Sequence, residues 1–492
     1  MAFVNIRDLT FGYEGGVGNV FENVSFHFDT DWKLGLIGRN GRGKTTLLKL
    51  LCGKLPYRGN ISSSVTMSYF PYDVEDKSRL SYEILGKVCP NAEDWEIIRE
   101  LSYLEMEAEV LYRPFSSLSG GEQTKLLLAG LFLNEGNFLL IDEPTNHLDA
   151  GSRDTVSAYL KKKKGFIIVS HDRYFLDGCV DHILSINKNG IEIQSGNFSS
   201  WLFNFEKTQA YESVKNERLK KEVTRLSESV RCTSDWSDRA EASKHGKACS
   251  GLKQDKGYVG HKAAKLMKRA KVVEARQLQA IAQKSELLRN AEENEPLKMF
   301  PLAYHSEKLL SLSDVQIFYG ACKVGSDVCL ELTQNERIAL VGKNGCGKSS
   351  ILKLIAGQKI DHRGMVKIAS GLIVSYVPQT VDDIRGNLVL FAKERNLDES
   401  LLMAVLSKMG LPKKIFSEDI SSYSQGQKKK VCLAASLCCR AHLYIWDEPL
   451  NYIDIDTRLQ IENLLCEFRP TMIFVEHDRA FRETVATRTL FL

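Results

Sequence analysis

The sequence lacks any long apolar run. Although 43% of its 492 residues are hydrophobic, no stretch reaches the roughly 18 to 20 consecutive apolar residues that a membrane-spanning helix needs. The opening residues Met1–Arg7 also lack the basic segment and apolar core of a secretory signal. We therefore expect a chain that neither spans a membrane nor is exported, and that works in the cytoplasm.

The twelve cysteines lack a pattern as well. They have neither the spacing of a disulfide framework nor that of a metal site, and Cys438 and Cys439 are merely adjacent. We expect free thiols in a reducing compartment. The net formal charge of +4 is close to neutral, and the chain length predicts roughly three domains of about 150 residues.

What the sequence does contain is an internal repeat. Four chemically distinctive positions recur in the same order at an offset of 304 to 306 residues. The pairs are Lys44 with Lys348, Ser119 with Ser424, Glu143 with Glu448, and His171 with His477. Because the paired residues stand in matching local motifs, we infer that two copies of one nucleotide-handling apparatus share the polypeptide.

Each copy begins with a glycine-rich loop between an apolar strand pattern and a helical pattern, the context of a phosphate loop. Its glycines let backbone N–H groups converge on phosphate oxygens, its lysine neutralises the β and γ phosphates, and the hydroxyl of Thr45 or Ser349 binds Mg²⁺. The residues expected to bind ATP are Gly38, Asn40, Gly41, Gly43, Lys44, Thr45 and Thr46 in the first loop, and Gly342, Asn344, Gly345, Gly347, Lys348, Ser349 and Ser350 in the second.

Further along, an apolar run in each copy is typical of a buried parallel strand and ends in two carboxylates, Asp142-Glu143 and Asp447-Glu448. The first carboxylate of each pair can hold Mg²⁺. The second can orient or deprotonate the attacking water. We therefore expect Asp142 and Asp447 to be metal ligands, and Glu143 and Glu448 to be catalytic.

Between loop and strand, a small polar residue and glycines open a helix, which makes a second anion-binding terminus. These segments are Leu118–Gln123 and Tyr423–Lys428. Together with His171 and His477, this order of motifs resembles the ATP-binding cassette (ABC) superfamily over about 390 residues. The expected fold class is α/β, with two ABC-type P-loop ATPase domains in tandem, joined by a long antiparallel α-helical hairpin.

The resemblance implies an ATP hydrolase that forms ADP and phosphate with Mg²⁺, in two sites shared head to tail between the copies. One site would join Lys44, Asp142, Glu143 and His171 to Ser424 and Gly426; the other would join Lys348, Asp447, Glu448 and His477 to Ser119, Gly120 and Gly121. His171 and His477 match the catalytic switch histidines of the family. Tyr13 and Tyr319 match the aromatic residue that stacks on adenine, with packing in the core as their alternative.

The two copies are unequal. The family's glutamine that reaches toward Mg²⁺ and water is present as Gln379, but Tyr72 stands at the matching position. The second signature also has Gln425 where the first has Gly120. Both departures fall on the site built on Lys44, so we expect that site to hydrolyse ATP differently or mainly to hold it.

A segment unlike either copy lies between them and predicts the domains 1–203, 204–297 and 298–492. Apolar residues at helical spacing indicate two helices of about 25 residues, each roughly 40 Å long. The polar stretch Ser234–Gly260 would form the tip of an antiparallel hairpin.

This segment is basic. Residues 239–276 contain eleven Lys and Arg against three acidic residues, a local charge of +8. A basic projection with Trp236 and Tyr258 at its tip is typical of nucleic-acid contact; the alternative is a solvated charged coil between domains.

The combination of two cassettes, a hairpin between them and no membrane segment resembles the ABC-F family. Within that family, the details of the motifs resemble the Lsa/Vga-type resistance proteins. The implied partner is the bacterial 70S ribosome, with contacts to 23S rRNA and P-site tRNA, and the implied task is the displacement of lincosamide, pleuromutilin or streptogramin A antibiotics by a monomer whose two cassettes pair. Alternatives are a housekeeping ABC-F translation factor and, less favoured, the ATPase subunit of an ABC transporter. The expected contacts in the basic tip, about 232–262, are Lys244, Lys247, Lys253, Lys256 and Tyr258.

Overall fold

The structure is a computed structural model of the 492-residue chain. It describes residues 3–13, 18–134, 136–187, 190–242, 297–320, 322–343, 345–382 and 384–492, with the isolated residues Lys268, Val272, Ala275, Arg276 and Gln279. The side chains of His147, Ser213, Val230, Ser326 and residues 232–242 are not described. The chain divides into one compact unit of residues 1–201 with 295–492, and a second of residues 202–294. We call 1–201 the first half, 295–492 the second half and 202–294 the linker.

The first half is built on a six-stranded sheet in the order β5-β6-β7-β3-β8-β9. In this sheet β8 and β9 pair antiparallel, and the other neighbouring strands pair parallel. Its strands are β3 (Lys33–Gly38), β5 (Thr66–Phe70), β6 (Asn137–Asp142), β7 (Phe166–Val169), β8 (His182–Asn187) and β9 (Gly190–Ser195). The apolar strands β6 and β7 are buried on both faces, as parallel strands covered by helices are.

A second, antiparallel sheet of the first half has the order β2-β1-β4. Its strands are β1 (Phe3–Phe11), β2 (Phe21–Asp29) and β4 (Arg58–Ser62). Ile6 on β1, Leu34 on β3 and Leu47 on α1 are each 0% exposed and share one apolar core. This core fixes the helix that follows the phosphate loop against both sheets.

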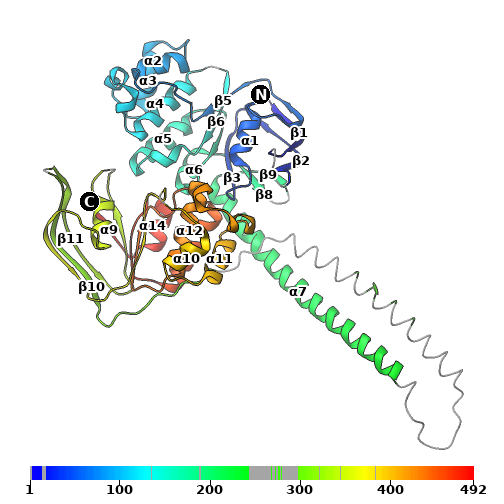
Figure 1. Ribbon diagram of the computed structural model, residues 1–492. Coiled ribbons are helices and arrows are strands. Elements are labelled where there is room, and N and C mark those ends of the chain that lie inside the picture. The colour runs from blue at the N-terminus through cyan, green and yellow to red at the C-terminus, as the bar shows by residue number, and fades with distance from the viewer. Residues whose placement is uncertain are drawn as a thin grey trace, which may run out of the picture. The chain divides into compact units, whose positions relative to one another are not determined.

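The helices of the first half begin at polar caps in several cases, such as Ser119, Asp149 and Asp172. They are α1 (Lys44–Leu51), α2 (Ser81–Val88), α3 (Asp94–Tyr103), α4 (Gly120–Phe132), α5 (Ala150–Lys162) and α6 (Arg173–Cys179), with 3₁₀ turns η1 (Ala108–Tyr112), η2 (Phe115–Ser117) and η3 (Pro144–His147). Figure 1 shows α2, α3 and α4 grouped together, with α1 beside β1 and β2.

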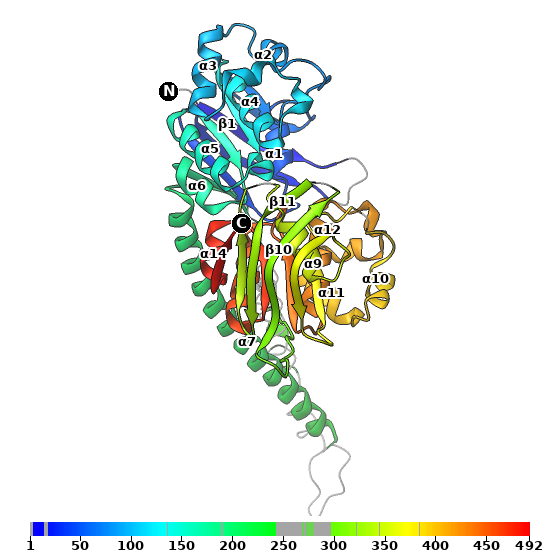
Figure 2. The ribbon, with the colours of Figure 1, turned by 90° about the vertical axis from the view of Figure 1, so that its left-hand side faces the viewer.

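The second half repeats this plan. Its main sheet has the order β14-β15-β16-β12-β17, all parallel, and its second sheet has the order β11-β10-β13. The strands are β10 (Lys308–Tyr319), β11 (Cys322–Thr333), β12 (Arg337–Val341), β13 (His362–Ile368), β14 (Val374–Val377), β15 (Leu443–Asp447), β16 (Met472–Val475) and β17 (Arg488–Phe491). The helices are α9 (Lys348–Ile355), α10 (Leu388–Glu394), α11 (Glu399–Lys408), α12 (Gln425–Cys438), α13 (Ile455–Phe468) and α14 (Arg479–Val485), with 3₁₀ turns η5 (Lys413–Ser417) and η6 (Ile420–Ser422). Figure 2 shows β10 and β11 as a long antiparallel pair.

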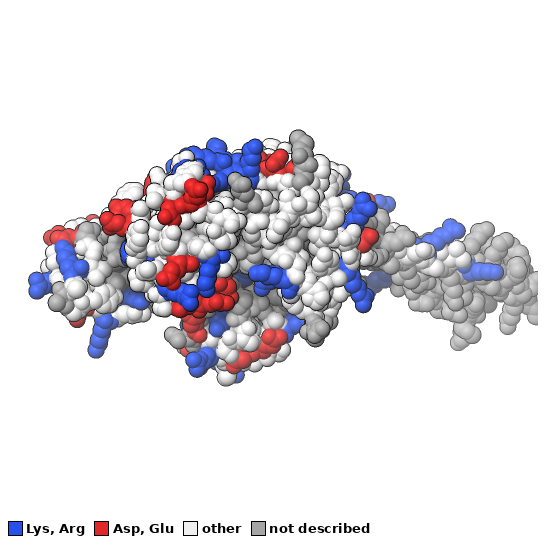
Figure 3. Space-filling model, turned by 90° about the horizontal axis from the view of Figure 1, so that it is seen from above, with Lys and Arg blue, Asp and Glu red and all other residues white. Residues whose placement is uncertain are grey.

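The repeat predicted from the motifs is therefore a repeat of topology, and the expected α/β class with two tandem domains is confirmed. On the face drawn in Figure 3, the acidic and basic side chains of the described residues form small groups of both signs. Among the described helices, none has the length and apolar composition needed to cross a membrane.

The first linker helix, α7 (Phe198–Ala242), differs from the prediction. It has 45 residues, or about 68 Å at 1.5 Å per residue, and it runs through Ser234, where we expected the tip to begin. The reason is visible in the sequence, because no glycine or proline interrupts residues 198–242. The second predicted helix and the basic tip from residue 243 onward lie outside the described residues, apart from the isolated helical residues between 268 and 279. The hairpin stays a prediction.

Candidate nucleotide-binding site

The phosphate loop of the first half joins β3 to α1 and ends at Gly43, the N-cap of α1. Gly43 has φ 89°, in the left-handed region. A Cβ here would lie 2.6 Å from a methyl carbon of Val20 and 2.9 Å from the ring of Phe21. Only glycine fits. The loop thereby brings the N-terminus of α1, with its unpaired backbone N–H groups, to the carboxyl edge of the sheet.

The lysine that begins this helix is buried. Lys44 Nζ donates to Gly38 O at 2.6 Å and to Asn40 Oδ1 at 3.2 Å. Burial lowers the pKa of Lys44, although the carboxylates of Glu143 and Asp454 oppose the shift. In the second half, Lys348 Nζ donates to Gly342 O and Lys343 O, both at 2.8 Å. Each ammonium is thus bound to neutral oxygens, a setting suited to a phosphate anion.

The catalytic glutamates predicted from the sequence stand immediately after β6 and β15. Glu143 has φ 48° and Glu448 has φ 46°, an unfavourable conformation for residues other than glycine. The neighbouring strand stabilises each one, since Glu143 N–H donates to Val169 O at 2.9 Å and Glu448 N–H to Val475 O at 3.0 Å. The same strained backbone therefore aims a carboxylate in both halves.

Each glutamate meets the switch histidine predicted for its half. His171 Nε2 lies 3.2 Å from Glu143 Oε1, and His477 Nε2 lies 3.4 Å from Glu448 Oε1. Burial lowers the pKa of His171 well below its usual value, with a further contribution from the positive charge of Lys44. His171 is consequently neutral at pH 7.

The pKa values of the two glutamates are shifted in opposite directions. Burial raises the pKa of Glu143 to about 8, against the attraction of Lys44. Burial would also raise the pKa of Glu448, but hydrogen bonds with His477, Gln379 and Asn451 outweigh it and lower that pKa to about 2. The Asn451 bond is 2.7 Å long. The surroundings of Glu448 therefore favour its charged form, whereas the burial of Glu143 disfavours its charged form.

The residues predicted to hold Mg²⁺ fit a cation, most clearly in the second half. Asp447 is 0% exposed, and neither of its carboxylate oxygens makes a hydrogen bond of normal geometry within the described residues, although the Ser349 hydroxyl acts to lower its pKa. Burial is the stronger effect and raises the pKa of Asp447 to about 6. A buried carboxylate beside a hydroxyl is a donor set that Mg²⁺ accepts. In the first half, Asp142 Oδ2 accepts a 3.0 Å bond from Tyr69 OH.

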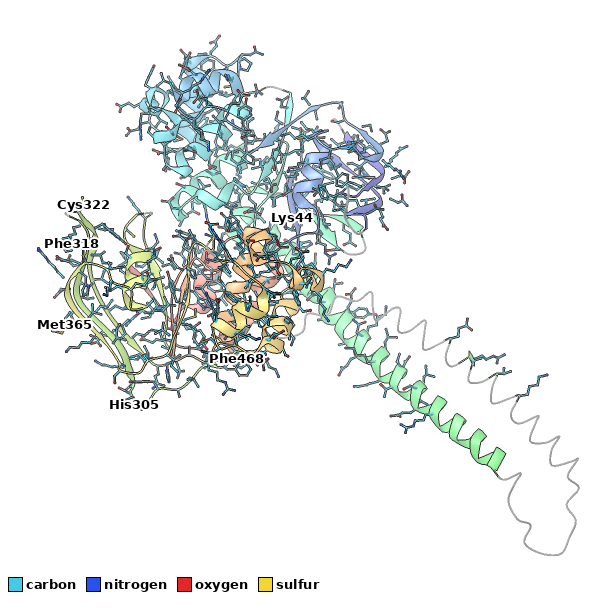
Figure 4. The ribbon with its side chains drawn as sticks, viewed as in Figure 1. Lys44, His305, Phe318, Cys322, Met365 and Phe468 are labelled. Atoms are coloured by element: carbon cyan, nitrogen blue, oxygen red, sulfur yellow. The ribbon has the colours of Figure 1, made fainter. Side chains whose placement is uncertain are left out.

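The cavity around Lys44 is shared by the two halves. It has a volume of about 460 Å³, within the usual range for small-molecule sites, and Figure 4 labels Lys44 at the beginning of α1. From the first half it is lined by Tyr13, Val20, Asn40, Gly41, Gly43, Lys44, Thr45, Thr46, Asp142, Glu143, Val169 and His171, and from the second by Gly410, Leu411, Pro412, Ser424, Gly426, Gln427, Lys430 and Tyr452. The structure thus brings the residues predicted for the first composite site to one cavity.

Polar contacts join the halves beside this cavity. Arg39 Nε lies 3.0 Å from Asp456 Oδ2, and Asn40 Nδ2 donates to Tyr452 O at 2.7 Å. Beside them lies a buried ion pair of the second half, in which Lys430 Nζ is 2.6 Å from Asp454 Oδ2. The sequence reading missed Asp454 and Lys430, although the repeat offset matches them to Asp149 and Lys125.

A second group of contacts crosses between the halves behind the histidine of the first half. Arg458 Nη1 donates to His171 O at 2.9 Å and to Asp478 Oδ2 at 3.1 Å. Arg173 Nη1 donates to Glu462 Oε2 at 3.1 Å, with both side chains nearly buried. Arg173 on α6 is thus joined to Glu462 on α13, and Arg458 on α13 is joined to His171 and to Asp478, the N-cap of α14. No motif in the sequence predicts these contacts.

For the second composite site, the hydrogen bonds given for Ser119 and Lys348 lie within their own halves in the part of the chain that the structure describes. Ser119 caps α4 in a reciprocal capping box with Glu122, and Lys348 bonds to its own loop. The pairing of Lys348, Ser349 and His477 with Ser119, Gly120 and Gly121 therefore stays a prediction, and Asn344 lies outside the described residues.

The predicted adenine-contact tyrosines lie at matching places. Tyr13 OH is 2.9 Å from Thr46 Oγ1, and Tyr319 OH is 3.0 Å from Ser350 Oγ. They are 51% and 54% exposed, which is inconsistent with packing in the core. Their contact with adenine stays a prediction.

The difference that the sequence predicts between the two halves is visible in the contacts of Gln379, Tyr72 and Gln425. Gln379 contacts Glu448, as described above, whereas Tyr72 lines a separate cavity of about 680 Å³ that also reaches Thr45, Asp142 and Glu143. Gln425 hydrogen-bonds Asp382 of its own half. The site on Lys44 therefore lacks the glutamine contact that its counterpart has.

These elements define a P-loop nucleotide-binding fold with a site shared between two copies. A family model described as ABC transporter matches residues 21–146 and 326–451, together just over half of the sequence. The chain belongs to this family.

The chain also resembles individual proteins along most of its length. Ribosome protection protein VmlR of Bacillus subtilis (strain 168) is 27% identical over 491 residues, covering 98% of this chain and 85% of that protein. Energy-dependent translational throttle protein EttA of Escherichia coli (strain K12) is 24% identical over 530 residues, covering 96% and 89%. Among solved structures, the complex of archaeal ribosomal stalk protein aP1 with archaeal ribosome recycling factor aABCE1 matches with a TM-score of 0.64 and 21% identity, covering 98% of this chain and 87% of that one; this likeness concerns the fold alone. The ABC-F assignment is confirmed, and the Lsa/Vga subgroup stays a prediction.

We predict that Glu448→Gln alone lowers steady-state ATP hydrolysis more than Glu143→Gln alone. The reason is that Glu448 contacts Gln379 and has surroundings that favour its charged form, whereas burial disfavours the charged form of Glu143 and its half has Tyr72. The expected difference is roughly tenfold, within the range that a general base contributes. Phosphate release at saturating ATP measures it, with ATP binding by both variants as the control. Equal losses would remove the argument for unequal sites.

Proposed function

We propose that this protein is a ribosome-binding ABC-F ATPase that protects the ribosome from antibiotics. In this proposal ATP binding pairs the two halves, the linker then enters the ribosome near the P-site tRNA and the peptidyl transferase centre, and a bound lincosamide, pleuromutilin or streptogramin A is dislodged. ATP hydrolysis then releases the protein.

The ATPase part of the proposal rests on one observation: Lys44 of the first half and Ser424 of the second half line the same cavity. Residues of both halves line it, so a nucleotide bound there would contact the phosphate loop of one half and the signature helix of the other. Its binding energy would then favour the paired arrangement over a separated one.

Within each site the chain's own residues have separate tasks. Backbone N–H groups of the loop and Lys44 or Lys348 would bind the phosphates. Thr45 with Asp142, and Ser349 with Asp447 and Gln379, would hold Mg²⁺, which supplies charge neutralisation on the phosphates when bound. Glu448, which contacts His477 and Asn451, would orient water and accept its proton.

The ribosome part rests on the sequence of the linker and on the relatives. VmlR bears the name of a ribosome protection protein and resembles this chain along nearly its whole length. The basic residues expected to meet RNA are Lys244, Lys247, Lys253, Lys256 and Tyr258, which all lie outside the described residues. In the chain they follow α7, a helix of 45 residues.

A second candidate is a translation factor that acts on ribosomes without an antibiotic. The similarity to EttA, named as a translational throttle, favours it. The two candidates differ in one simple outcome, the drug susceptibility of a sensitive bacterium with and without this gene. A rise in the inhibitory concentration of at least one of the three drug classes supports protection, and no rise in any class supports the translation factor.

The tip provides the matching prediction. If it acts at the drug site, Tyr258→Ala or Lys244→Ala should reduce protection against at least one drug class, while expression and basal ATP hydrolysis stay near wild type. Inhibitory concentrations and phosphate release from purified protein measure the two effects. A tyrosine with a structural task would instead lower the melting temperature, because truncating a buried aromatic costs roughly 3 to 5 kcal/mol.

Deletion of residues 244–260 tests the whole tip. Unchanged resistance in this deletion and in both point variants would overturn a role for the tip in protection. Loss of resistance with normal ribosome binding would assign the tip to the drug site.

A further inference from the structure

Lys429 on α12 is a buried cation without a counterpart in the first half. It is 1% exposed, and the repeat offset matches it to Thr124 on α4. Burying a lysine is costly unless its charge and its three N–H donors are satisfied. Its partners therefore indicate why the residue is a lysine.

Those partners lie on the other elements of the Lys348 site. Lys429 Nζ donates to Pro378 O at 2.7 Å, to Gln379 O at 3.2 Å and to Asp447 O at 3.2 Å. Three donors thus meet three carbonyl oxygens. Two belong to the loop after β14, which carries Gln379, and one to the end of β15, which carries Asp447 and Glu448.

In the first half the same place is open. Thr124 Oγ1 donates to Gly120 O of its own helix at 3.0 Å. The cavity of about 680 Å³ is lined there by Tyr72, Thr124 and Asp142. Their counterparts in the second half are Gln379, Lys429 and Asp447, at offsets of 305 to 307 residues. The second half thus has a lysine bridging helix, loop and strand where the first half has a cavity.

The helix that carries Lys429 also faces the other nucleotide site. Ser424, Gly426 and Gln427 at the start of α12 line the cavity around Lys44. Lys429 lies five residues after Ser424, a rise of about 7.5 Å along the helix. A shift of α12 at the Lys44 cavity would therefore move the anchor of Gln379 and Asp447.

We propose that Lys429 is a positioning residue that holds Gln379 and Asp447 in place for the metal of the Lys348 site, and that it links this site through α12 to the nucleotide bound at Lys44. The inference rests on the proposed binding of ATP and Mg²⁺. The connection through Lys429 belongs to the second half alone, because Thr124, at the matching position of the first half, bonds to its own helix.

The test measures metal binding rather than turnover. Mn²⁺ replaces Mg²⁺, a non-hydrolysable ATP analogue fills the sites, and electron paramagnetic resonance reports free and bound Mn²⁺. Lys429→Met should weaken Mn²⁺ binding about tenfold at one of two sites, because the loop and the strand end lose their shared anchor, while the affinity for the analogue without metal stays within about twofold.

Matched variants separate positioning from stability. Lys429→Arg retains the charge and should restore Mn²⁺ binding to within about threefold. Lys428→Met makes the same change one residue earlier, at a lysine for which the described residues give no hydrogen bond to β14 or β15, and should leave Mn²⁺ binding unchanged. If Lys429→Met unfolds below the assay temperature, Lys429→Gln replaces it, since the amide keeps two donors and removes the charge.

The link between the sites is tested by a double-mutant cycle. Lys44→Ala removes nucleotide from the first site and should weaken Mn²⁺ binding at the Lys348 site. In the Lys429→Met background it should have no further effect, so the two losses are not additive.

The outcomes are distinct. Equal Mn²⁺ affinities in Lys429→Met and Lys428→Met would overturn the positioning role, and so would a loss of analogue affinity without metal. Fully additive losses in the cycle would overturn the link through α12. Wild-type protein that binds no Mn²⁺ with the analogue would overturn the proposed function together with this inference.

Discussion

Replacing Glu143 and Glu448 together by glutamine is expected to trap the protein on ribosomes when ATP is present. Glutamine keeps the shape of each side chain but cannot accept a proton from water, so hydrolysis should fall by about 100-fold or more. The phosphate loops, Lys44 and Lys348 are untouched, so ATP should still bind and pair the halves. The variant should co-sediment with ribosomes through a sucrose gradient, whereas wild-type protein should leave them as ATP is consumed.

The controls for this trap come from the same sites. With ADP, or with Lys44→Ala and Lys348→Ala added, the double glutamine variant should stay at the top of the gradient, because the paired state needs bound ATP. Free protein in ATP, with nucleotide binding confirmed by a fluorescent analogue, would contradict the assignment of the two glutamates or of the ribosome as partner.

The sequence predicts the parts of the site that depend on local chain order. Gly43 must be glycine because of its φ and its neighbours, and Glu143 must follow a buried strand, so both leave a motif that can be read without a structure. The contact of each glutamate with its histidine follows from the same order, because parallel strands bring their carboxyl ends to one edge.

The parts that sequence could not supply are contacts between distant segments. Arg458 reaches His171 O across 287 positions of the chain, and Lys429 bonds to carbonyl oxygens, which every residue has and no motif marks. The pKa difference between Glu143 and Glu448 likewise depends on burial and on the bonds of Gln379 and Asn451. The helix α7 is longer than predicted for another reason: the polar composition from Ser234 onward is typical of a loop, but no glycine or proline interrupts residues 198–242.

The difference between the halves also changes how the glutamates should be compared. Glu143 is buried beside Lys44 without a glutamine like Gln379, and burial raises the pKa of its carboxyl. Glu448 has three hydrogen-bond partners that favour its charged form. The pKa values of identical motif residues are thus shifted in opposite directions because the residues around them differ.

Arg458→Met is expected to cause the largest loss of stability among single substitutions at the border between the halves. Arg458 is 6% exposed, and its guanidinium donates to Leu450 O at 2.8 Å, Ile453 O at 2.9 Å, His171 O at 2.9 Å and Asp478 Oδ2 at 3.1 Å. Among the described residues, its removal would leave Asp478, which is 0% exposed, with Arg173 at 3.9 Å as its remaining ion-pair partner. Removing one partner of a buried ion pair costs about 3 to 5 kcal/mol of unfolding free energy.

Arg153→Met is the matched control because Arg153 holds the equivalent place in the first half. It donates to Asp172 Oδ2 at 2.8 Å and to Leu148 O at 3.1 Å, both in its own half. Calorimetry should show both variants melting about 10 °C lower, but only Arg458→Met should separate the melting of the two halves into two transitions, since it alone removes the bond to His171 O. A single transition in Arg458→Met, at the temperature of Arg153→Met, would mean that the bond from Arg458 to His171 does not hold the halves together.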